Sequence, residues 1–142
     1  MIASSFMKRG RFGANLLLMT DARTHLLGWQ WAAYPDAHRN RANLWLHVVT
    51  VPIFMAGTLA AVTSPFTGVA AAAGGLVAMA VAMAAQGRGH RQEASPPAPF
   101  RGPLDVIARI FAEQWITFPR FVLSGSLSRA LRGTRAPAHD AG

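Results

Sequence analysis

The chain has no cysteine and little charge, and each shortage excludes a class of protein. Without cysteine there is no disulfide, no thiolate nucleophile and no cysteine-ligated zinc or iron–sulfur site. Charged residues make up 14% of the 142 residues, whereas soluble domains carry about 25%. Residues 42–87 contain no Asp, Glu, Lys or Arg at all. So long a stretch without charge indicates contact with lipid.

The charge that is present is mostly positive, with 14 Lys and Arg against 6 Asp and Glu. These cations lie on both sides of the uncharged segment and do not alternate with stacking aromatics, so nucleic acid is not a predicted partner. Lys and Arg collect in the cytoplasmic flanks of membrane helices. We therefore expect an integral membrane protein with both termini in the cytoplasm, in a bacterial inner membrane.

The uncharged segment has the length of two membrane crossings. Residues 44–63 and 69–85 are predicted spans, because about 20 residues of helix cross about 30 Å of hydrocarbon. The Ser-Pro-Phe-Thr-Gly sequence at 64–68 is a turn signal between them. The second span is rich in alanine, so a buried core helix is its alternative. The predicted fold class is all-α, a two-span helical hairpin.

The flanks divide into a domain and two tails. We expect a mobile basic tail over 1–19, one membrane-embedded helical domain over 20–123 and a disordered basic tail over 124–142. Within the domain, helical spacing of apolar residues predicts amphipathic, interfacial helices over 21–34 and 104–118. Between the second span and the second of these helices, residues 86–102 are rich in Gly and Pro and predict a loop. Arg109 and Glu113, four residues apart, are predicted to form an ion pair.

Three histidines gather at one end of the predicted hairpin. His47 lies just inside the first span, His90 just beyond the second, and His38 just before the first. Neutral imidazole is the commonest metal ligand, and an ionisable residue in an apolar span is by default a functional hypothesis. With Glu93, these residues suit a non-haem Fe(II) site with open coordination positions.

Each of these residues also has a structural interpretation. A hydrogen bond to a neighbouring helix would satisfy His47, and solvent would satisfy His38 and His90. Glu93 can form a surface ion pair with Arg91. Bis-histidine haem ligation by His47 and His90 is a further alternative. Asn43, one helical turn before His47, is placed either to orient its ring or to cap the helix.

The histidines belong to a longer pattern. The motif reads Tyr34…His38-x-Asn40-x-x-Asn43-x-x-x-His47, followed by Pro52, then Gly89-His90, a glutamate and Pro97-Ala98. This pattern resembles the membrane-embedded 2-hydroxy-fatty-acid dioxygenases first characterised in fungi, over about residues 34–53 and 89–98. Residues 113–121 resemble shorter, bacterial-looking relatives, which suggests a divergent short member.

The resemblance implies an Fe(II) enzyme of fatty-acid α-oxidation. It would use O2 to shorten a 2-hydroxy long-chain fatty acid by one carbon. By similarity, His38, His47 and His90 fall on the motif histidines of the family, with the outer motif residues Tyr34, Asn40 and Asn43 around them. The cations placed to attract the substrate carboxylate are Arg39, Arg41 and Arg91. The alternative function is a non-catalytic membrane protein that binds lipid or a partner and uses its histidines for hydrogen bonds.

Overall fold

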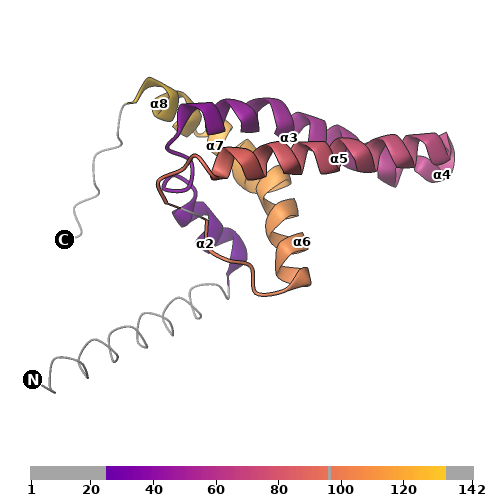
Figure 1. Cartoon of the computed structure of the whole chain (residues 1–142), viewed down its shortest axis with the longest axis horizontal. Coiled ribbons are helices and arrows are strands. Elements are labelled where there is room, and N and C mark those ends of the chain that lie inside the picture. Colours follow the sequence, from indigo (N-terminus) through magenta and orange to yellow (C-terminus); the bar gives the residue numbers. More distant parts are fainter. Residues whose placement is uncertain (1–24, 96, 134–142) are drawn as a thin grey trace, which may run out of the picture.

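A computed structural model of the protein describes residues 25–95 and 97–133. The regular elements of these residues are helices, so the predicted all-α class is confirmed. In chain order they are α2 (Leu26–Ala33), α3 (Arg41–Val62), α4 (Ser64–Thr67), α5 (Val69–His90), α6 (Pro103–Ala112), the π-helical turn η2 (Glu113–Thr117), α7 (Phe118–Leu123) and α8 (Ser126–Arg132). Figure 1 shows their arrangement.

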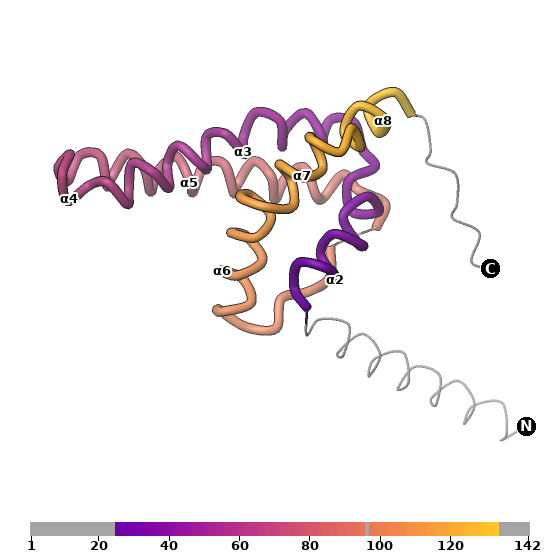
Figure 2. Tube along the Cα trace, turned by 180° about the vertical axis from the view of Figure 1, so that it is seen from behind, coloured from indigo at the N-terminus to yellow at the C-terminus, as the bar shows by residue number. Residues whose placement is uncertain are grey.

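The longest feature is an antiparallel hairpin of α3 and α5, joined at its tip by the short helix α4 (Figures 1 and 2). Both helices have 22 residues and are long and apolar enough to cross a membrane, by length and composition. Only 28% of the most apolar part of α3 and 17% of that of α5 are buried inside the protein. A core helix of a soluble protein would be mostly buried, so these two helices turn apolar side chains outward.

The helix α5 continues to His90, five residues beyond the end of the predicted span and into the predicted loop. Glycine in a helix costs only about 1 kcal/mol, so Gly87 and Gly89 do not end the helix. Gly89 is buried, and a Cβ atom added to it would overlap Oδ1 of Asn43 on α3. Glycine at this position therefore lets the open end of the hairpin close tightly.

The two hairpin helices also approach closely near the middle of the hairpin. A Cβ atom added to Gly57 would lie 2.6 Å from the carbonyl oxygen of Gly75, and one added to Gly75 would overlap the carbonyl oxygen of Gly57. Small residues at such a crossing allow two helix backbones to pack against each other.

The remaining elements pack at the open end of the hairpin, opposite α4. In Figure 1, α6 leaves the hairpin at a steep angle, α2 lies across from α6, and the chain from α5 returns between them. The buried core of this region consists of Tyr34, Leu44, Val51, Phe118 and Phe121.

Two predicted boundaries were wrong in this region. Part of the tail predicted to be disordered forms α8, because Leu127, Ala130 and Leu131 make an apolar helical face that packs on the core. The second interfacial helix does not stop before Pro119, since helical structure continues through η2 and α7 to Leu123. Of the first interfacial helix, the described part is α2, from Leu26 to Ala33, and residues 21–24 of that prediction lie outside the described residues. The predicted tail over 1–19, and the tail beyond residue 133, lie outside the described residues.

The glycine contact predicts the effect of a single methyl group. Gly75→Ala should destabilise the folded protein by about 1–3 kcal/mol, because overpacking forces the two helices apart. Gly74→Ala is the matched control, since nothing lies within 4 Å of a Cβ atom there. Thermal unfolding in detergent should give a lower midpoint for Gly75→Ala and an unchanged or higher one for Gly74→Ala. Equal midpoints would contradict the close packing.

Candidate metal centre

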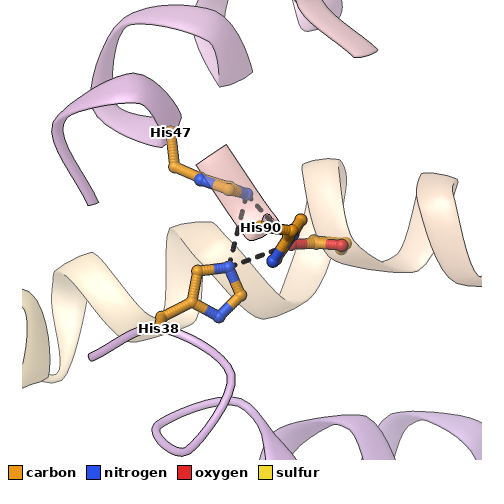
Figure 3. A group of neighbouring side chains, drawn as sticks. His38, His47 and His90 are labelled. Atoms are coloured by element: carbon orange, nitrogen blue, oxygen red, sulfur yellow. Dashed lines mark hydrogen bonds and ion pairs between the residues drawn. The ribbon is translucent and has the colours of Figure 1, made fainter. Parts of the chain in front are cut away.

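Four side chains from four separate segments converge at the open end of the hairpin. They are His38, before α3; His47, in the second turn of α3; His90, the last residue of α5; and Glu113, the first residue of η2. One potential ligand atom from each lies within 4.8 Å of the others. Figure 3 shows the three histidine rings pointing toward one another. These positions agree with the prediction that the three histidines lie together at one end of the hairpin.

Hydrogen bonds fix which nitrogen of two of these rings carries the proton. Nδ1 of His38 lies 3.0 Å from the carbonyl oxygen of Tyr34, and Nδ1 of His47 lies 2.9 Å from that of Asn43. A carbonyl only accepts, so both Nδ1 atoms donate. In the neutral rings the Nε2 atoms then carry lone pairs, and these atoms face each other at 3.3 Å.

The Glu113 carboxylate adds a third acceptor at the same point. Its Oε1 lies 3.5 Å from Nε2 of His38 and 3.4 Å from Nε2 of His47. Burial by itself raises the pKa of the Glu113 carboxyl, but hydrogen bonding and charge from His38 and His47 outweigh burial and hold the pKa well below its usual range. Glu113 is therefore an anion beside the two rings, and either a proton on one of the facing Nε2 atoms or a cation bound between them stabilises it.

Two buried polar atoms beside this point, Nδ1 of His90 and the hydroxyl of Tyr34, have no hydrogen-bond partner among the described residues. Leaving such an atom unpaired costs about 1–3 kcal/mol. The Tyr34 ring stacks on His38 with 3.9 Å between centroids. Burial, and then the negative charge of Glu113, raise the pKa of Tyr34 well above its ordinary value. Its phenol is thus a protonated donor.

Glu93 lies outside the group of four. Its carboxylate accepts hydrogen bonds from the backbone N–H groups of Arg39 and Asn40, both at 3.0 Å, and from the Nδ2 amide of Asn43 at 2.7 Å. It therefore ties the segment after α5 to the start of α3. The sequence interpretation placed Glu93 among the candidate ligands; in the structure the group of four contains Glu113 and not Glu93.

The carboxylate that joins the histidines is the one that the sequence paired with Arg109. Glu113 instead faces His38 and His47, while the Arg109 guanidinium lies 3.7 Å from Asp105 and donates to the carbonyl oxygen of Ala98. No spacing rule in the sequence identifies Glu113. The sequence signal for an irregular turn at this place was Pro119, because a proline ring clashes with the carbonyl group four residues earlier in an α-helix.

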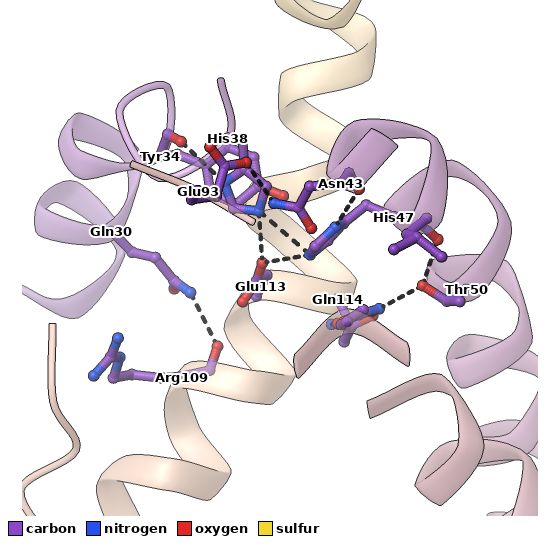
Figure 4. Close-up of polar contacts among 12 residues, drawn as sticks. Gln30, Tyr34, His38, Asn43, His47, Thr50, Glu93, Arg109, Glu113 and Gln114 are labelled. Carbon is purple, nitrogen blue, oxygen red and sulfur yellow. Dashed lines mark hydrogen bonds and ion pairs between the residues drawn. The ribbon is translucent and has the colours of Figure 1, made fainter. Parts of the chain in front are cut away.

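The wider turn η2 is what aims Glu113 inward. π-helical turns accommodate one more residue per hydrogen-bonded ring than an α-helix and are frequent at functional sites. In η2 and at the start of α7 the neighbours Glu113 and Gln114 both point into the protein, as do Thr117 and Phe118. Gln86 and Gln114 exchange hydrogen bonds of 3.1 and 2.7 Å, and Gln86 also donates to the Thr50 hydroxyl at 2.9 Å (Figure 4). This network holds η2 against both hairpin helices.

The two asparagines of the motif organise the start of α3. Asn40 is the N-cap of α3, with its side chain accepting from the N–H groups of Ala42 and Asn43. The ring of His47 is oriented by the backbone carbonyl of Asn43, whereas the Asn43 side chain binds Glu93. The predicted orienting role of Asn43 thus belongs to its main chain.

A cavity of about 120 Å³ opens beside the group of four, between α2, α5, α6 and the chain around residues 97–100. His38, His90 and Glu113 form part of its wall. The three arginines predicted to bind the substrate carboxylate, Arg39, Arg41 and Arg91, do not line this cavity. Arg39 pairs with Asp36 at the surface, and Arg41 and Arg91 are exposed. The cation in the cavity wall is Arg109.

Comparison with known proteins agrees with the motif resemblance. A family model described as 2-hydroxy-palmitic acid dioxygenase Mpo1-like matches residues 25–119. The matched residues include the three histidines and Glu113. No curated protein and no solved structure matches the chain. Because the family match covers most of the sequence, the chain belongs to the Mpo1-like family.

Proposed function

We propose that the protein is a membrane-embedded, Fe(II)-dependent dioxygenase that shortens a 2-hydroxy long-chain fatty acid by one carbon. The observation that carries this proposal is the pair of Nε2 atoms of His38 and His47, held 3.3 Å apart with the Glu113 carboxylate beside both. A divalent cation bound between these atoms would coordinate all three and remove the repulsion between their lone pairs. The family match supports the same class of reaction.

The donor set fits a first-row metal. Ligand bonds to such an ion are about 2 Å long, so opposing ligand atoms lie about 4 Å apart, near the 4.8 Å span of the four residues. Histidine and carboxylate ligands with positions left open are typical of non-haem Fe(II) oxygenases. Haem fits less well, because the rings of His47 and His90 are 5.1 Å apart and leave no room for a porphyrin between them.

The reaction needs no second reductant. A 2-hydroxy acid and O2 give the acid one carbon shorter, CO2 and water, and the four electrons lost by the two cleaved carbons match those gained by O2. Bound iron would supply the activation of O2 and a Lewis-acid centre for the carboxylate and α-hydroxyl. His38, His47, His90 and Glu113 would hold the ion. The Tyr34 phenol, buried beside His38, would donate a hydrogen bond to the substrate head group.

The hairpin supports a location in the membrane. Its helices have the length of a membrane crossing and expose large apolar residues such as Val49, Ile53, Leu76, Val77 and Val81. A long-chain fatty acid partitions into the same apolar layer. The four-residue group lies at the open end of the hairpin, where the acid head group of a lipid would reach it.

The first test of the metal site compares candidate ligands with a histidine outside the group. His47→Ala and Glu113→Gln should lose bound iron and O2-dependent formation of the shortened acid, because each removes a ligand. His25→Ala is the matched control, since His25 is exposed at the start of α2 and lies outside the group. Metal analysis of purified protein and product analysis check both effects. Equal iron content in His47→Ala and His25→Ala would end the shared-site proposal and favour a non-catalytic protein.

A second test separates the two glutamates. Glu93→Gln should weaken iron binding by about 10–100-fold, the usual cost of losing a residue that orients the ligands, because an amide cannot accept all the hydrogen bonds that Glu93 accepts. Glu113→Gln should cost more. Iron titration of both variants measures the difference. A larger loss for Glu93→Gln would restore Glu93 as the ligand.

The orientation of the hairpin is also testable. Arg39, Arg41, Arg88 and Arg91 lie at its open end, and residues 63–68 at its tip carry no charge. The positive-inside rule then places the open end in the cytoplasm. A topology reporter fused after Phe66 should be active outside the cytoplasm, and one at the C-terminus should be active inside. A cytoplasmic signal at Phe66 would show that the hairpin does not cross.

A further inference from the structure

The cavity beside the candidate metal centre is lined by both polar and apolar side chains. Near the metal centre its wall includes His90, Glu113 and Tyr34, and Nδ1 of His90 and the Tyr34 hydroxyl have no hydrogen-bond partner among the described residues. The rest of the wall is largely apolar, with Trp29, Ala33, Met83, Phe100 and Ile110, and it also includes Gln30, Gln86 and Arg109.

The cavity extends away from the candidate metal centre between α5, α6 and α2. Along α5 the wall runs from His90 through Gln86 to Met83, and seven residues of helix span about 10 Å. On the opposite side, Arg109 lies one turn before Glu113. Gln30 links α2 to α6, because its side-chain amide donates a hydrogen bond of 3.0 Å to the carbonyl oxygen of Arg109.

The outer end of the cavity is held in place by Arg109. Its guanidinium lies 4.9 Å from the centroid of Trp29 and 4.5 Å from that of Phe100, and it donates to the carbonyl oxygens of Ala98 and Pro99. The aromatic faces and carbonyls balance its charge. The residue thus fastens residues 98–100 over the cavity.

The size of the cavity limits what it can hold. An apolar cavity of about 150 Å³ admits a benzene molecule, so the 120 Å³ here accommodates about five or six carbon atoms. A group placed there would extend directly from a head group at the metal centre. A long fatty acid exceeds this volume, and its remaining carbons must lie outside.

We propose that this cavity binds the first five or six methylenes of the acyl chain, next to the 2-hydroxy acid head group. The proposal rests on the proposed function, because the head group must reach the iron for the cavity to receive the chain that follows it. The acyl chain beyond the cavity contacts lipid or solvent-exposed residues. Chain-length preference therefore levels off once the acid is long enough to fill the cavity, and a branch close to the head group is rejected.

A binding experiment tests the location of the chain without catalysis. Iron-loaded protein in detergent, kept free of O2, is titrated with 2-hydroxyhexadecanoic acid carrying bromine on the fifth or on the penultimate carbon, because bromine quenches tryptophan on contact. Bromine on the fifth carbon should quench Trp29 more strongly. The difference should vanish in Trp29→Phe, while the other three tryptophans remain. Equal quenching by the two acids in the unmodified protein would overturn the proposal.

A matched pair of variants tests the same cavity by activity. Ala33 lies in the cavity wall, and Ala32 beside it on α2 does not. Each buried methylene contributes about a fourfold gain in affinity, so Ala33→Phe, by excluding three of them, should lower kcat/KM for the long acid about sixtyfold relative to 2-hydroxybutanoate. Ala32→Phe should leave this ratio unchanged, and both variants should keep their iron. Equal ratios in the two variants would contradict the acyl site.

The two readouts distinguish the proposals. Position-dependent quenching of Trp29 without O2-dependent product would support the acyl site and reject the dioxygenase. Product formation together with position-independent quenching would support the dioxygenase and reject the acyl site.

Discussion

The structure depends on holding two imidazole lone pairs and one carboxylate against one another inside the protein. The Nε2 atoms of His38 and His47 face each other because the carbonyl groups of Tyr34 and Asn43 take up both Nδ1 protons. Such an arrangement is electrostatically unfavourable without a positive charge among the acceptors, and each unpaired buried acceptor costs about 1–3 kcal/mol. The surrounding fold must therefore supply the free energy that keeps these groups together.

The supports of the site act between elements of the fold. Glu93 joins the end of α5 to the start of α3, and Gly89 lets Asn43 pack against the same end. Gln86 and Gln114 join α5 to η2. Because each of these contacts fixes the position of one helix relative to another, a change at any of them would move one candidate ligand relative to another without altering the candidate ligands themselves. Ligand orientation by such outer residues commonly changes metal affinity by about 10–100-fold.

The sequence predicted the parts of the structure that follow from local composition. The charge gap over residues 42–87 predicted the hairpin, and antiparallel pairing then brought His47 and His90 to one end. Local sequence pattern could not show whether Glu93 or Glu113 lies with the three histidines. Glu93 is close to His90 in sequence, whereas Glu113 reaches the histidines only because α6 returns to the hairpin and η2 turns its first residue inward. Tertiary packing, not spacing, selects the carboxylate.

The position of the site at the end of an apolar hairpin follows from the amphipathic nature of its proposed substrate. A fatty acid has a charged head that is costly to bury and a chain that is costly to expose. A metal centre in the middle of the hairpin would require the head group to enter hydrocarbon, and one on a distant soluble domain would require the chain to leave it. The open end of α3 and α5 avoids both costs, since the candidate ligands meet there beside a cavity with a largely apolar wall. Chemistry on the carbon next to a carboxylate thus favours a site at the boundary, where the histidines and Glu113 lie.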